Sequence, residues 1–207
     1  MTEAQQSETV LSRLQELDPI VENMRLMLGA ARHAFNRHSQ SQLAEIAQLL
    51  EDITLDIDPV FEDLEEDLEK ASEDDKPDLL KLKEIVSQVE LMAHRIADLA
   101  EPIRRKGNKG AILADKDLFC INDLFSHLTG FMRTLVDILH INDAALKAYV
   151  VIEGEKLRDE CFRNETEHET RMMDSPGQAG AWSIFIDLLN GFREIVGHLL
   201  NIIKLLG

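Results

Sequence analysis

The chain has 207 residues, of which 44% are hydrophobic, enough for one large domain or two small ones. Its formal net charge of −17 argues against a protein that binds the nucleic-acid backbone, which needs a basic surface. Aromatic residues make up only 5%, and the 10 glycines and 5 prolines supply few turns, so a β-sandwich or β-barrel is not expected.

The N-terminal residues are polar and acidic, unlike a signal or transit peptide. No apolar run in the sequence reaches the roughly 18 residues of a membrane span. The two cysteines, Cys120 and Cys161, are far apart and form no CxxC pattern. We therefore expect reduced thiols in a cytoplasmic protein.

The first half of the chain predicts three helices. An apolar stripe in steps of three and four residues predicts a helix that ends near 37–39, and Pro19 predicts a kink or a late start in it. The second helix is expected over about 41–71, with a bend at Pro59 and a very acidic far end. The third should stop at the basic, glycine-containing segment 104–110.

The second half predicts three more helices. The first covers about 115–140 and is apolar on more than one face, so we expect it to be central. The next starts at Asn142 and Asp143 and runs to about Met173. After a Ser, Pro and Gly break at 175–180, an apolar stripe predicts the last helix.

The two halves repeat each other at an offset of 103 residues. At this offset the apolar positions of all three helices coincide, and so do the turns before the third helix. The sequence therefore predicts an all-α protein of two tandem three-helix bundles, six long antiparallel helices in all. We place the first repeat at 1–106, a linker at 107–114 and the second repeat at 115–207.

A pair of acidic residues four positions apart occurs at equivalent places in the two repeats. Asp52 and Asp56 form the first pair, and Glu155 and Asp159 form the second. Residues at this spacing share one helix face, where two carboxylates repel each other unless a cation lies between them. The pairs are therefore candidate metal ligands. A solvated acidic face is the alternative, because chance pairs are common among 39 acidic residues.

With these two acidic pairs and the repeat, the sequence resembles the PhoU family. The family carries an acidic-x-x-x-Asp motif on the second helix of each repeat, and a second motif on the third helix. The third-helix motif corresponds here to Glu90-Leu-Met-Ala-His94-Arg-Ile-Ala-Asp98-Leu99 and to Arg193-Glu-Ile-Val-Gly197-His198-Leu-Leu-Asn201-Ile202. The last helix is most similar to the cytoplasmic PhoU-type domain of sodium–phosphate cotransporters.

The resemblance implies a metal site. Family members bind multinuclear iron or zinc clusters, and the matching positions are Asp52, Asp56, Glu155 and Asp159, with His94 and Asp98 as further ligands. Oxygen ligands alone favour other divalent cations such as Mg²⁺, Ca²⁺ or Mn²⁺, whereas histidine favours iron or zinc. The sequence departs from the family pattern where the third-helix aspartate is replaced by His94 in one repeat and by Gly197 in the other.

The resemblance also implies a function. It predicts a non-enzymatic regulator or accessory protein of phosphate uptake and phosphate-responsive signalling. Such a protein would be cytoplasmic or peripheral at the inner face of the membrane, where it meets a phosphate transporter or a sensor kinase. The sequence leaves a homodimer open. It also leaves open a metal-dependent enzyme on a helical bundle and a helical scaffold without metal. Glu165 and His168 fit a di-iron Glu-x-x-His motif, but in one copy only.

Overall fold

The computed structural model describes residues 12–174 and 179–207, which form helices and no β-strand. The apolar stripes of the sequence lie on long α-helices, each with an apolar face toward the core. The helices are α2 (Asp18–Arg37), α3 (Gln40–Lys70), α4 (Lys76–Asp98), α5 (Ala100–Lys109), α6 (Asp115–Ile141), α7 (Ala144–Asp174) and α8 (Ala179–Leu206).

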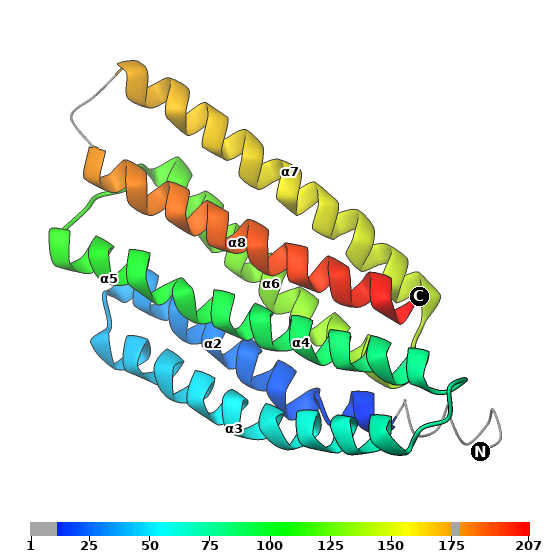
Figure 1. Ribbon diagram of the computed structural model, residues 1–207. Coiled ribbons are helices and arrows are strands. Elements are labelled where there is room, and N and C mark those ends of the chain that lie inside the picture. Colours follow the sequence, from blue (N-terminus) through cyan, green and yellow to red (C-terminus); the bar gives the residue numbers. More distant parts are fainter. Residues whose placement is uncertain (1–11, 175–178) are drawn as a thin grey trace.

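The helices form two layers (Figure 1). In one layer α3 packs on α4, α4 packs on α8, and α8 packs on α7. Helices α2 and α6 lie behind this layer and pack on each other. The first repeat is thus α2, α3 and α4 with α5, and the second is α6, α7 and α8. The two repeats meet along α4 with α8 and along α2 with α6.

The starts of the second and third helices of each repeat follow the offset predicted from the sequence. Helices α3 and α7 begin at Gln40 and Ala144, an offset of 104 residues. Helices α4 and α8 begin at Lys76 and Ala179, an offset of 103 residues. The fold is therefore the predicted pair of tandem three-helix bundles.

Local sequence explains where the helices begin and end. Pro19 occupies the first turn of α2, where a missing N–H costs nothing. A helical turn at 12–15 precedes α2 and ends two residues before it, so the kink or late start predicted at Pro19 takes the form of a break. His38 follows α2 in the left-handed conformation with φ of 54°, and the Ser39 side chain then caps α3 by accepting from the backbone N–H of Gln42. Asp143 caps α7 by accepting from two backbone N–H groups at 2.8 and 2.9 Å.

The third helix of the first repeat ends within the predicted segment 104–110, but it is divided into two helices, α4 and α5. The chain turns slightly at Leu99 and continues as α5 to Lys109. Helix α5 ends at Gly110, whose φ of 57° is the left-handed conformation that glycine adopts most easily. One of the basic residues before it, Lys106, is buried and donates to the backbone carbonyl oxygen of Phe35 on α2.

One hydrophobic core runs through both repeats. Its centre contains Phe125 of α6, whose ring centroid lies 4.9 Å from that of Phe192 on α8 and 6.3 Å from that of Phe35 on α2. Since these rings come from both repeats, the two bundles share apolar burial and are expected to unfold together.

Candidate functional site

The first carboxylate pair lies on α3. Asp52 is half-buried and accepts a hydrogen bond of 3.0 Å from Nε2 of Gln48, one turn earlier. Asp56 is exposed. Within the described part of the chain, neither carboxylate forms an ion pair with a cationic side chain, so both remain open to solvent cations.

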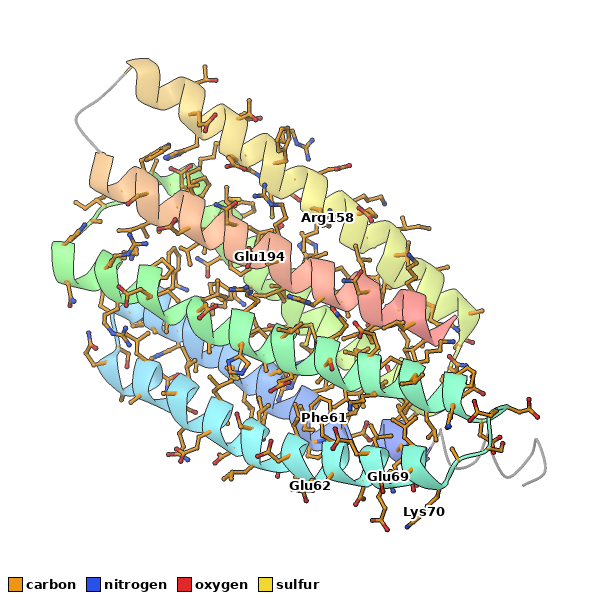
Figure 2. All side chains as sticks on the ribbon, viewed as in Figure 1. Phe61, Glu62, Glu69, Lys70, Arg158 and Glu194 are labelled. Carbon is orange, nitrogen blue, oxygen red and sulfur yellow. The ribbon has the colours of Figure 1, made fainter. Side chains whose placement is uncertain are left out.

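The second carboxylate pair lies on α7. Both oxygens of Glu155 accept from Nη1 of Arg158, at 3.2 and 3.3 Å, and Asp159 is exposed. Arg158 lies on α7 near α8, as Figure 2 shows. Arg158, on the same helix, therefore already provides Glu155 with the positive charge that a metal ion would otherwise supply.

The predicted third-helix residues lie on α4. His94 and Asp98 are both exposed, and Asp98 accepts from Nη1 of Arg95 at 3.1 Å. The Nε of the same arginine lies 3.0 Å from a carboxylate oxygen of Glu194 on α8. Arg95 therefore joins the two repeats and occupies the position between the two acids.

As placed, these residues do not fit a multinuclear metal cluster. Among residues 12–174 and 179–207, no group of three or more His, Cys, Asp or Glu side chains lies close enough to hold one ion. The helices bring together at most two predicted ligands on one turn, and Gly197 offers no side-chain donor. Binding of a single cation by each carboxylate pair stays a prediction, and no step below depends on it.

A groove of about 780 Å³ is lined by residues of α7, including Glu155, and of the C-terminal half of α8. Three cations line it with that one acidic side chain: Lys147, Arg158 and Lys204. Lys147 donates to the backbone carbonyl oxygens of Leu206, at 3.3 Å, and Gly207. The second-repeat position of the predicted metal site is therefore a region of positive charge, which disfavours a metal ion.

Two further polar contacts were not predicted from the sequence. Asp117 and His168 are both buried, and an Asp117 carboxylate oxygen lies 3.2 Å from Nδ1 of the imidazole, which packs on Phe185 at 4.6 Å between ring centroids. Glu165, the other half of the Glu-x-x-His pattern, instead pairs with Arg193 at 3.0 Å. The Glu-x-x-His pattern is therefore part of the packing between helices, and no di-iron ligand pair forms there.

The histidine of the last helix joins the two repeats. Nδ1 of His198 lies 2.8 Å from Oε1 of Gln88 on α4, and burial lowers the pKa of this imidazole. The two cysteines are also buried, and burial raises the pKa of each thiol to about 12. A raised pKa keeps each thiol protonated at neutral pH, and the thiolate is the reactive form. Neither thiol is therefore an activated nucleophile.

Two solved structures share this arrangement of helices. The crystal structure of PhoU from Pseudomonas aeruginosa superposes with a TM-score of 0.84, at 16% identity, and covers 99% of this chain and 97% of that one. The chain has a PhoU-like fold. The phosphate transport system regulatory protein PhoU from Streptococcus pneumoniae gives a TM-score of 0.81 at 13% identity, covering 97% of this chain and 94% of that one.

The PhoU-like fold is shared at low sequence identity. The sequence matches no protein-family model and no curated protein sequence. Because the superpositions cover nearly the full length of both PhoU chains, the expected PhoU-like fold is confirmed. Within the described residues, no helix is both long and apolar enough to cross a membrane.

Proposed function

We propose that the protein is a non-enzymatic regulator or accessory protein of phosphate uptake and phosphate-responsive signalling. The observation that carries the proposal is the full-length match to two PhoU structures, one of which is described as a phosphate transport system regulatory protein. Buried thiols of raised pKa and a buried Asp117–His168 contact support action by binding, because none of these groups is both reactive and accessible.

The surface of α3 suggests how the protein meets its partner. The sequence of α3 contains 11 acidic residues and one lysine, whereas α7 contains eight acidic and five basic residues. Glu62, Glu69 and Lys70 mark the outer side of α3 in Figure 2. Cytoplasmic loops of membrane proteins are enriched in Lys and Arg, so α3 complements such loops and is repelled by anionic lipid.

The partner that fits this surface is a phosphate transporter or a sensor kinase at the inner face of the membrane, and the protein acts there as a cytoplasmic, peripheral component. Contact through basic protein loops explains how a strongly acidic chain can work at a negatively charged membrane. Metal binding is not required for this mode of action.

Charge reversal on α3 tests the contact. The variant Glu62→Lys with Glu69→Lys should lose regulation of phosphate uptake in cells that lack the wild-type protein. The matched control, Asp137→Lys with Glu169→Lys, makes the same charge change at exposed positions of α6 and α7 and should retain regulation. Equal activity of both variants would show that α3 is not the contact surface.

A further inference from the structure

A polar depression between α2 and α6 is lined by two arginines, Arg32 and Arg37. It has a volume of about 620 Å³ and is lined by Gly29, Arg32, His33, Asn36, Arg37 and Asn122. Among residues 12–174 and 179–207, no carboxylate pairs with either of its arginines. In a chain with net charge −17, two arginines that line one depression without a carboxylate partner in the described part of the chain point to an anionic ligand.

The side chain of Arg32 is held in place by a network of amides. Its Nε donates to Oδ1 of Asn122 at 3.1 Å. Asn36 and Asn122 donate to each other's side-chain oxygens at 2.8 and 3.1 Å, and Asn36 also donates to the backbone carbonyl of Arg32 at 2.9 Å. These contacts leave both terminal guanidinium nitrogens without a partner in the described chain. A guanidinium fixed in this way can bind two oxygens of an oxyanion at low entropic cost.

The depression is open at its glycine. A Cβ atom at Gly29 would meet no neighbouring side chain within 4 Å, so the space beside this glycine is not filled by protein. These polar residues are particular to the first repeat. The positions one repeat later than Arg32 and Asn36 are Leu135 and Leu139, and both are fully buried.

We propose that this depression, the α2–α6 anion site, binds a phosphoryl-type oxyanion. Arg32 provides two parallel hydrogen bonds, Arg37 adds a second positive charge, and His33 offers a ring nitrogen at the same wall. Two guanidinium charges match a phosphoryl dianion better than a carboxylate monoanion. The site goes beyond the proposed function, because it lies between α2 and α6 and needs no contact through α3.

The source of the phosphoryl group can be free phosphate or a lipid headgroup, and two probes separate them. Isothermal titration of the full chain with inorganic phosphate at low ionic strength tests the free ion. Sedimentation with phosphatidylcholine vesicles that contain phosphatidic acid tests the headgroup. We expect saturable binding of one probe, reduced about tenfold or more by Arg32→Gln, since hydrogen bonds to charged groups contribute strongly.

Two further variants and a control complete the test. Arg32→Lys keeps the charge but loses the planar pair of guanidinium donors, so it should also weaken binding. Gly29→Glu should weaken binding by placing a carboxylate in the open space. Arg163→Gln removes an exposed arginine of α7 and should change the affinity less than about twofold. Thermal unfolding confirms that each variant is folded.

Several results would overturn the anion site. They are no binding of either probe, equal loss of binding in Arg163→Gln and Arg32→Gln, or acetate binding as tight as that of phosphate. None of them bears on regulation through α3, which is tested separately by charge reversal in cells.

Discussion

Gly191 of α8 lies directly against Leu99, the residue at which α4 gives way to α5. A Cβ atom at position 191 would lie 2.6 Å from Cδ2 of Leu99, which is buried. The contact brings the last helix of the second repeat close to the last helix of the first. Alanine at this position should therefore disturb the junction of the two repeats.

We predict opposite effects for alanine at two helical glycines. Gly130→Ala, where a Cβ would meet nothing within 4 Å, should stabilise the protein by about 0.5–1 kcal/mol through helix propensity. Gly191→Ala should be at least about 1 kcal/mol less stable than Gly130→Ala, because Leu99 must move. Urea unfolding measures both. In a double-mutant cycle Leu99→Ala should relieve part of the Gly191→Ala cost, and strict additivity would contradict the contact.

Lys106 connects the end of α5 to the end of α2. Its Nζ donates to the backbone carbonyl oxygen of Phe35 at 3.0 Å and lies 4.8 Å from the centre of that ring. The carbonyl belongs to the last turn of α2, where a cation is favourable. Lys106→Ala should destabilise the protein by about 2 kcal/mol in urea unfolding, from lost packing and an unsatisfied carbonyl. Lys109→Ala, an exposed neighbour, should change stability by less than about 0.5 kcal/mol.

The buried thiols make the stability of the protein depend on pH above neutrality. Burial raises the pKa of Cys120 and Cys161 to about 12, above the ordinary value of 9.0. Between these values the unfolded chain loses thiol protons that the folded chain keeps, so stability should fall as pH rises above about 9. In urea unfolding from pH 8 to 10.5, the free energy of unfolding should fall less steeply for the double variant Cys120→Ala, Cys161→Ala than for the wild type.

Thiol reactivity provides a second readout of the same burial. At pH 8 the native protein should react with a thiol reagent more than about 100-fold more slowly than the urea-unfolded protein. Rapid modification of the native protein would show that the thiols are accessible and would remove the basis for the pH dependence.

The carboxylate pairs predict limited metal binding. Equilibrium dialysis against Mn²⁺, Fe²⁺, Ni²⁺ and Zn²⁺ should load about one ion at Asp52 and Asp56, and Asp56→Ala should abolish this loading. Asp159→Ala should change the loading little, because the cations beside Glu155 disfavour a metal ion at the second pair. Several ions per repeat would contradict the described arrangement of ligands. No bound ion at all would contradict the prediction that the pairs are metal ligands.

Periodicity sufficed to predict the helices, because each buried stripe follows the 3.6-residue period and the two repeats support each other. The i to i+3 pairing of Glu155 with Arg158 was also visible in the sequence, although its consequence for a metal site was missed. Lys106 could not be assigned, because a basic residue in a last helical turn gives no sign of the carbonyl beside it. The contact between Asp117 and His168 joins positions 51 residues apart and carries no local signal.

The central claim is regulation of phosphate uptake, and a deletion strain tests it most directly. Uptake of radiolabelled phosphate and the phosphate-starvation response are measured in the deletion strain, with and without the wild-type gene restored. We predict that deletion alters uptake or the starvation response and that the restored gene reverses the change. Unaltered uptake together with an unaltered starvation response would contradict the proposed function.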